Sequence, residues 1–370
     1  MHVTTTGRAL AAAITAARKA VGRTPYGDRR AIIRRDGDAA YLVAADAETT
    51  YAEVIGEADP AAAPVQYVAD LTTLPALKGA ELVTITPAGI TADGVTMPAA
   101  IADPDHLPAE REAGTATVTL EAEGSAAADV VAELHGVARA ASRDAHGRAV
   151  LGVVLIADGY AAATDTYRLH AAEVPTDGDG SALIPEHVIR AIPTGVDYLY
   201  LAGDQAGGPV AAPDAGTFLV RWSAPPRGRT PRRTGYLTGY AIAGPYPRWR
   251  TLLPAEAELE GAPTITTTGT VKTAIGPAAK AGKAAGANTP VILGWQADAP
   301  GTVTAEAGGV AVALGTATTG TGSIAYNPAY LADLDGYLGA GGELVVRDGL
   351  KATVGTNGGR TALLMPMRVS

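Results

Sequence analysis

Cysteine is absent from the 370 residues of this chain. The protein can therefore form no disulfide, thiolate metal site, iron–sulfur cluster or cysteine nucleophile. Aromatic residues are also scarce, with three Trp, fourteen Tyr and one Phe, so the cores must consist mostly of Ala, Val, Leu and Ile. With 47% hydrophobic and 18% charged residues, the chain can still bury large cores, and its length predicts two or three domains.

Long apolar runs are lacking as well. The run Ala149–Ala157 is far shorter than the roughly 20 residues that a membrane-spanning helix needs. The apolar run Ala9–Ala17 precedes the basic pair Arg18-Lys19, whereas in a signal peptide the basic residues come first. These features predict a cytoplasmic protein that neither enters a membrane nor is exported.

Motifs for catalysis and for metal binding are missing too. Residues Gly276–Lys283 look like a phosphate-binding loop, but Gly276 and Gly282 are six positions apart instead of five, and Ala284 replaces the Ser or Thr that would bind Mg²⁺. The six His have neither HExxH nor paired-ligand spacing, and Asp177–Gly180 lacks the other ligands of a calcium loop. We therefore expect no enzymatic activity, no cofactor and no metal ion.

The charges are unevenly distributed. A net charge of −9 argues against a protein that coats nucleic acid with its whole surface. However, residues 216–255 contain seven Arg and no acid, and residues 261–297 contain three Lys and no acid. Such stretches are either solvated basic loops or part of a surface that meets a polyanion.

A threefold repeat runs through the sequence. Its first marker is a strand-like segment that ends in Gly and occurs at Val3–Gly7, Val118–Gly124 and Ile265–Gly269. Its second marker is a helical segment that occurs at Val68–Leu71, Pro185–Ile189 and Pro328–Leu331. The repeat predicts three α+β domains, each with a sheet and its helices on one side. Their boundaries are 1–113, 114–258 and 259–370, with an Arg- and Pro-rich insertion at 223–233.

The first helix of each repeat has one apolar stripe and a basic remainder. In the first repeat the stripe is Leu10, Ile14, Ala17 and Val21. The second helix is expected to continue to Ala141, so that His135, Arg139 and Arg143 share one face. A solvated helix face would explain any one of these patterns, but basic faces at three equivalent positions favour a binding surface.

Three short stretches resemble the bacterial β sliding clamp, the processivity subunit of DNA polymerase III. Ala163–Leu169 (ATDTYRL) is similar to the A-T-D-G-H-R-L of that family, and Tyr246–Pro254 (YPRWRTLLP) is similar to its F-P-D-Y-R-R-V-L-P. The ending Leu364–Val369 (LMPMRV) is close to V-M-P-M-R-L. Their order, together with the repeat, extends the resemblance over essentially the whole chain. Thr166-Tyr167 and Thr251 depart from the family pattern, so partner preference is expected to differ.

The resemblance implies the DNA clamp fold, in which each domain has antiparallel sheets outside and two helices lining the interior of a ring. Clamps of this family are head-to-tail homodimers that encircle double-stranded DNA without reading its sequence and tether the polymerase. The ring closes through the first and last domains, and Val95 and Met97 are expected on an edge strand near the partner subunit. Phosphate contacts of this kind are non-specific and sensitive to salt.

The resemblance and the basic faces together give two sets of candidate residues. The expected DNA contacts are Arg8, Arg18, Lys19, Arg23, Arg139, Arg143, Arg148, Lys272, Lys280 and Lys283. The expected pocket for short hydrophobic motifs of the DNA polymerase and the clamp loader is lined by Val150, Thr164, Tyr167, Arg168, Leu169, Pro247, Leu252, Leu363, Met365, Pro366 and Met367. Arg168 and the backbone near Met365 are expected to supply the polar contacts to such a motif.

Other interpretations stay open at this point. One is an accessory or phage-borne clamp with altered partner specificity. Another, from a different class, is a self-assembling scaffold protein that does not bind DNA. A hydrolase has almost no support from motifs, and the sequence does not decide between a dimeric and a trimeric ring.

Overall fold

The computed structural model describes residues 2–21, 30–46, 48–59, 61, 67–70, 77, 79–86, 88–98, 115–143, 148–204, 216–228, 230–271, 273, 276, 290–296, 302–307, 310–317 and 321–368. The chain forms two compact units. The first comprises Met1–His135, Ile156–Gly159 and Val174–Gly244, and the second comprises Gly136–Leu155, Tyr160–Glu173 and Pro245–Ser370. Both units combine a few helices with antiparallel strands, so the predicted α+β class is confirmed.

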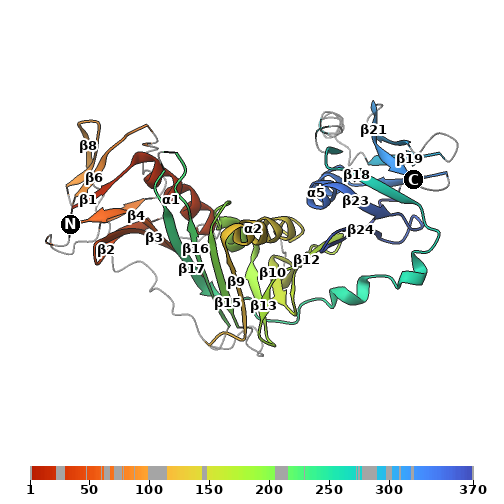
Figure 1. The fold of residues 1–370 in the computed structure, drawn as a ribbon, viewed down its shortest axis with the longest axis horizontal. Coiled ribbons are helices and arrows are strands. Elements are labelled where there is room, and N and C mark those ends of the chain that lie inside the picture. Colours follow the sequence, from red (N-terminus) through yellow and green to blue (C-terminus); the bar gives the residue numbers. More distant parts are fainter. Residues whose placement is uncertain are drawn as a thin grey trace. The chain divides into compact units, whose positions relative to one another are not determined.

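The first unit contains one large sheet (Figure 1). Its strands are β1 (Val3–Thr5), β2 (Arg30–Asp36), β3 (Ala39–Ala45), β4 (Thr49–Ala58), β5 (Tyr67–Asp70), β6 (Val83–Thr86), β7 (Gly89–Ala92), β8 (Val95–Pro98), β9 (Val118–Glu123), β13 (Thr176–Asp177), β15 (Tyr198–Gly203), β16 (Thr217–Ala224) and β17 (Arg233–Tyr240). They follow the order β13-β9-β15-β16-β17-β4-β1-β6-β7-β8, while β3 joins β4 to β2, and β2 joins β5. The strand β8 therefore lies at the end of this order, as the sequence predicts for Val95 and Met97.

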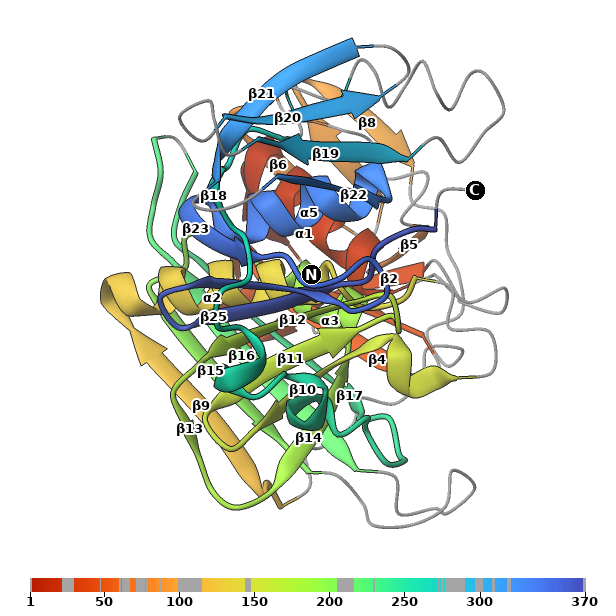
Figure 2. The same ribbon diagram turned by 90° about the vertical axis from the view of Figure 1, so that its right-hand side faces the viewer.

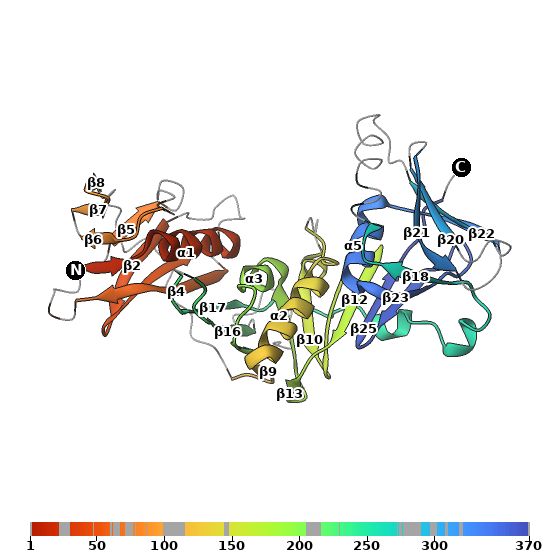
Figure 3. The same cartoon turned by 45° about the horizontal axis from the view of Figure 1, so that its top comes forward.

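Helix α1 (Gly7–Ala20) covers β4 and β3 and packs against α3 (Glu186–Ala191), which follows β14 (Ser181–Pro185). Figure 3 shows α1 lying along this sheet. Thr6 caps the helix, because its hydroxyl accepts a hydrogen bond from the Ala9 N–H at 3.2 Å. The predicted apolar stripe is buried, and the many alanines beside it let the helix approach the sheet closely.

The second unit also contains a sheet and a covering helix. Its strands are β11 (Tyr160–Thr164), β12 (Arg168–Glu173), β18 (Thr264–Thr268), β19 (Val291–Trp295), β20 (Thr302–Ala307), β21 (Val310–Ala317), β22 (Gly322–Tyr326), β23 (Ala340–Val345), β24 (Thr353–Asn357) and β25 (Arg360–Leu364). They follow the order β11-β12-β25-β24-β23-β18-β21-β20-β19-β22. Helix α5 (Pro328–Leu338) packs on β23, β24 and β25 (Figure 3). Its N-cap is Asn327, whose side-chain oxygen accepts a hydrogen bond from the Ala329 N–H at 2.9 Å.

Short 3₁₀ helices and two shared elements complete the description. The 3₁₀ helices are η2 (Ala149–Leu151), η3 (Trp249–Leu252) and η4 (Glu256–Glu258). Helix α2 (Gly124–Ala138) and strand β10 (Val153–Ala157) contribute residues to both units. In the described parts of the chain, no helix has both the length and the apolar character needed to span a bilayer.

Two helix predictions from the repeat are wrong. The segment beginning at Val68 is not helical, because Tyr67–Asp70 forms β5 and pairs with β2, Val68 lying opposite Ile32. Strand pairing with a distant segment outweighs the local sequence preference there. Helix α2 ends at Ala138 and does not reach Ala141, because the chain turns and the Ser142 N–H donates to the Leu151 carbonyl at 2.7 Å. The helical segments at Pro185–Ile189 and Pro328–Leu331 correspond to α3 and α5.

A buried charge cluster joins β4 to β17 in the first unit. The Arg233 guanidinium donates to both carboxylate oxygens of Glu53, at 2.5 and 2.9 Å, and stacks over the Trp222 ring at 5.4 Å. The Tyr51 hydroxyl donates to the same carboxylate. Burial, followed by the nearby Glu53 charge, raises the pKa of Tyr51 well above its usual value, so the phenol stays a neutral donor. These bonds fix the register between segments that are about 180 residues apart in sequence.

A buried histidine organises the interior of the second unit. His170 on β12 stacks on the Tyr337 ring of α5 with 4.2 Å between ring centroids, and its Nδ1 lies 3.0 Å from the Gly136 carbonyl. A carbonyl only accepts hydrogen bonds, so Nδ1 carries the proton. Gly136 is required opposite the stack, since a Cβ there would lie 2.8 Å from Tyr337 Cδ2. Burial lowers the pKa of His170 to about 4. The hydrogen bond to Gly136 acts in the opposite direction but is the smaller effect.

This burial predicts a loss of stability in acid. Below pH 6.5 the unfolded chain protonates His170, while the folded protein does so only near pH 4, so the free energy of unfolding falls as the pH drops through this window. Over the full window the contribution is about 3 kcal/mol. His170→Phe keeps a ring stack but cannot titrate, so its denaturation curves, measured from pH 7 to pH 4, should show a shallower pH dependence. His2→Gln, which changes an exposed histidine, should keep the wild-type slope; equal slopes in all three proteins would refute this account.

Candidate functional site

The antiparallel pairing of β12 with β25 brings two of the sequence motifs together. Leu169 lies directly opposite Leu363, and Arg168 lies opposite Leu364. The Met365 N–H then donates to the Tyr167 carbonyl at 2.9 Å. The pairing thus joins residues that are nearly 200 positions apart in sequence.

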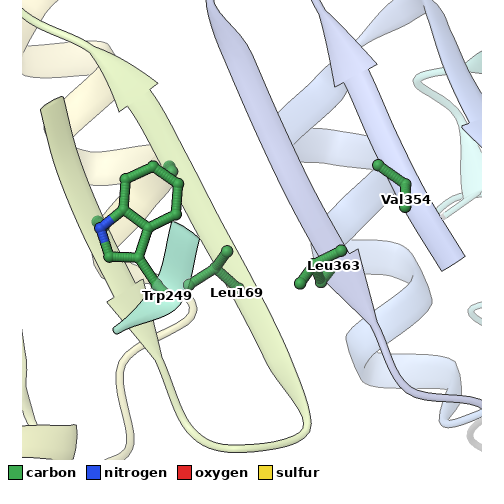
Figure 4. Close-up of a cluster of buried hydrophobic side chains, with 6 residues drawn as sticks. Leu169, Trp249, Val354 and Leu363 are labelled. Atoms are coloured by element: carbon green, nitrogen blue, oxygen red, sulfur yellow. The ribbon is translucent and has the colours of Figure 1, made fainter. Parts of the chain in front are cut away.

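An apolar cluster forms where these strands meet η3 (Figure 4). Its buried members are Ala162, Leu169, Ala171, Trp249, Val354 and Leu363. Trp249, the first residue of η3, contacts the Tyr160 ring edge to face with 5.7 Å between centroids. The Tyr246 hydroxyl donates to the Ala162 carbonyl at 3.2 Å, and burial raises the pKa of this phenol, so the donor is permanent. The first two motifs therefore share one packed core, which Leu363, the residue before the third motif, completes.

Exposed apolar side chains lie next to this buried cluster. Leu252 at the end of η3 is 55% exposed, and Tyr167 and Met365 are also exposed. Of the other predicted pocket residues, Thr164 is buried, while Val150, Pro247, Pro366 and Met367 are partly exposed. Large apolar side chains that stay in water beside a packed core are typical of a surface that binds another apolar group.

Arg168 lies beside this surface and is bound to two carboxylates inside the protein. Its Nε donates to Asp165 Oδ2 at 3.0 Å, and its Nη1 donates to Asp333 Oδ2 of α5 at 2.6 Å. The guanidinium also stacks over the Tyr330 ring at 4.3 Å, and the side chain is only 10% exposed. Arg168 therefore holds the β11–β12 hairpin on α5, and the Met365 N–H is used within the sheet. That Arg168 and the backbone near Met365 contact a ligand stays a prediction.

The turn between β11 and β12 is strained. The Asp165 carboxylate accepts hydrogen bonds from the N–H groups of Tyr167 and Arg168, both at 3.0 Å, which closes a tight turn. Thr166, inside this turn, has φ of 78°, the left-handed region that a β-branched residue rarely adopts. This is one of the positions where the sequence departs from the family pattern, which has Gly there.

The predicted DNA-contacting residues fall into three groups. Arg8, Arg18 and Lys19 are exposed on α1, where Arg8, Thr15 and Lys19 follow one helix face. Arg139, Arg143 and Arg148 are exposed, but all three follow the end of α2 and so do not extend its face. Arg23, Lys272, Lys280 and Lys283 lie outside the described residues.

His135 does not belong to a cationic face. Its Nε2 lies 3.0 Å from the Ile189 carbonyl. Burial lowers its pKa, and the nearby Arg190 and Lys19 charges act in the same direction. The ring is therefore neutral, and the exposed residues of α2 include Asp129 instead of a cation.

Sequence reasoning missed part of the apolar cluster. Trp249, Tyr246 and Tyr160 carry much of it, and Trp249 and Tyr246 stand within the motif Tyr246–Pro254 that the sequence already singles out. Asp333, the second partner of Arg168, had no signal in sequence because it lies 165 residues away. Among the described residues, no group of three or more His, Cys, Asp or Glu is placed to hold a metal ion.

The strained turn gives a direct test of the geometry. Thr166→Gly should raise the free energy of unfolding by up to about 1 kcal/mol, since relief of the left-handed backbone outweighs the extra freedom of glycine in the unfolded chain. Thr356→Gly, at an exposed position within β24, should instead lower it by a similar amount. Chemical denaturation of both variants measures the difference, and a destabilising Thr166→Gly would show that the turn is not strained.

The comparisons with known proteins point in one direction. No protein-family model and no curated protein matches the sequence. Among solved structures, the DNA polymerase III β subunit of Thermotoga maritima and the sliding clamp of Bacillus subtilis are each 16% identical to this chain, with a TM-score of 0.71. A Helicobacter pylori β clamp bound to a DNA ligase peptide is 13% identical, with a TM-score of 0.70. All three likenesses cover 100% of both chains. Over its whole length, this chain therefore has the fold of the bacterial β sliding clamp.

Proposed function

We propose that this protein is a DNA sliding clamp, a non-catalytic subunit that encircles duplex DNA and tethers a DNA polymerase in the cytoplasm. The observation that carries the proposal is the full-length likeness to β clamps, which leaves no part of either chain uncovered. The basic face of α1 and the apolar surface at η3 and β25 support it independently of that likeness. A scaffold protein without DNA contacts would not need the basic face.

In this proposal two chains close a ring head to tail, each with domains 1–113, 114–258 and 259–370. The strand β8 supports such closure, because a terminal strand offers unpaired backbone groups to a partner. Val95 on this strand is 65% exposed. An exposed large apolar residue on an open edge is suited to a contact between subunits.

The DNA contacts of the proposed clamp are electrostatic. Arg8 and Lys19 stand three helical turns apart on the exposed face of α1 and can meet phosphates. Arg18, Arg23, Arg139, Arg143, Arg148, Lys272, Lys280 and Lys283 are assigned to the same role. Since the protein carries a net charge of −9, the acidic remainder of its surface repels DNA and leaves these cations as the place of contact.

The apolar surface of the second unit is the proposed partner site. A short peptide with two or three large apolar side chains would cover Leu252, Met365 and Tyr167 above the buried Leu169–Leu363 pair. Met is flexible and adapts to different side chains, which suits one site that serves several partners. The Helicobacter pylori clamp, with its DNA ligase peptide, is an example of a clamp that binds a peptide. The polymerase and the clamp loader are the partners that we assign to this site.

Peptide binding tests the partner site. Leu252→Ala should weaken the binding of a synthetic peptide with Leu and Phe anchors by about tenfold or more, because a few apolar contacts carry most of the energy of such interfaces. Leu252 is 55% exposed, so its truncation should leave the fold intact. Leu82→Ala, which truncates a leucine of the first unit that is 59% exposed, is the matched control and should bind normally. Calorimetry reads both affinities, and equal affinities in the two variants would argue against this site.

DNA retention tests the ring. Once loaded, the wild-type protein should stay on nicked circular DNA and leave linear DNA through its free ends, because topology holds it in place and affinity does not. The double variant Arg8→Glu/Lys19→Glu should be loaded less well on any DNA sequence. Lys351→Glu, which reverses an exposed charge on the loop between β23 and β24, should load normally. Gel filtration of protein–DNA mixtures measures retention; equal retention on linear and circular DNA would contradict the clamp.

A further inference from the structure

The Arg-rich segment 223–233 is the hairpin between β16 and β17. The two strands are paired as far as Ala224 and Arg233. Beyond this pair, Arg227 and Thr230 exchange two backbone hydrogen bonds of 3.0 Å that close the turn. Pro225, Pro226 and Pro231 flank this turn. Their rings fix φ at these three positions, which reduces the freedom of the segments on either side of the turn.

Two arginines of the hairpin serve the protein's own stability. Arg233 is bound to the buried Glu53. Arg232 forms an ion pair with Asp197 at 2.8 Å and also donates to Ser223 Oγ at 3.1 Å. The hydrogen bonds from Ser223 and Arg232 lower the pKa of Asp197, so this carboxylate stays charged. The charges of Arg232 and Arg233 are therefore compensated by acids.

Arg227 differs from both. Its Nη2 donates to the Gly195 carbonyl at 3.3 Å, a neutral partner. Gly195 has φ of 68°, and a Cβ at this position would lie 1.9 Å from Nη2, so the guanidinium occupies space that only glycine leaves open. Within the described part of the chain, no carboxylate forms an ion pair with Arg227, which is exposed. One hydrogen bond thus orients the exposed side chain, and no acid of the described residues compensates its positive charge.

The hairpin lies at the end of the helical layer of the first unit. Gly195 belongs to the loop that follows α3, and α3 packs on α1. Figures 1 and 2 both show the hairpin end of β16 and β17 at the height of α1. Successive side chains of β16 point to opposite faces of the sheet. Val220 and Trp222 are buried on one face, and Arg221 is exposed on the other.

We propose that the hairpin around Arg227 is an additional phosphate-binding element, which contacts the backbone of the DNA that the clamp encircles. This inference rests on the proposed clamp function. A guanidinium presents its donors in a planar fork that fits two phosphate oxygens. The hydrogen bond to Gly195 already orients Arg227, which reduces the entropy lost when it binds. The DNA contacts predicted from the sequence include no residue of this hairpin.

Equilibrium binding to a short fluorescent duplex, measured by anisotropy over a range of salt concentrations, tests the element. Arg227→Glu should weaken binding about fivefold at low salt and reduce the slope of log K against log salt by about one, as expected for one lost phosphate contact. Arg227→Lys keeps the charge but loses the planar fork, so its affinity should lie between those of the wild type and Arg227→Glu. Arg221→Glu reverses an exposed charge on β16 itself, outside the hairpin turn, and should bind normally.

The outcomes separate this proposal from the clamp itself. If Arg227→Glu binds like the wild type while Arg8→Glu/Lys19→Glu does not, the hairpin is not a DNA contact and the clamp function stands. If Arg227→Lys is as weak as Arg227→Glu and both melt at lower temperature, Arg227 is a brace for the loop and the proposal is wrong. If both charge reversals bind normally and retention on linear and circular DNA is equal, the clamp function itself fails.

Discussion

The register between β12 and β25 is the constraint on which the candidate partner site depends. It places Leu169 opposite Leu363 and aligns both with Trp249 of η3. A register shift of one residue would turn these leucines to the other face of the sheet and remove them from the apolar cluster. Arg168 joins the β11–β12 hairpin to α5, because it binds Asp165 on its own hairpin and Asp333 on α5. Removing either carboxylate would leave a largely buried charge less well compensated.

The arginines of this protein divide into two kinds by their partners. Arg168 and Arg233 are mostly buried and paired with carboxylates; Arg233 joins β17 to β4, and Arg168 joins the β11–β12 hairpin to α5. Arg8 and Arg227 are exposed and keep charges that can act on a polyanion. Charge alone, whether counted over the chain or over a segment, does not separate these kinds. The segment 216–255, which contains no acid, finds its acids elsewhere, in Glu53 and Asp197.

The departures from the family motif have a structural consequence. Thr166 occupies a left-handed backbone position, and the turn persists because the Asp165 carboxylate binds two N–H groups there. The neighbouring Tyr167 is left exposed above Tyr330, with 6.4 Å between ring centroids. A larger aromatic surface therefore borders the proposed partner site than a Gly-His pair would give, which is a physical basis for a different partner preference.

The sequence by itself determined the local features: the buried stripe of α1, the helical segment that begins at Pro328, the α+β class, and the two motifs that supply Leu169 and Trp249 to one core. These follow from periodicity, capping and side-chain type, which act over a few residues. Only the tertiary structure decided that Val68 lies in a strand, that α2 ends at Ala138, and that Arg168 is occupied by Asp333. The reason is physical: strand pairing and ion pairing join residues far apart in the chain, and their energies outweigh the local preferences that a sequence pattern reports.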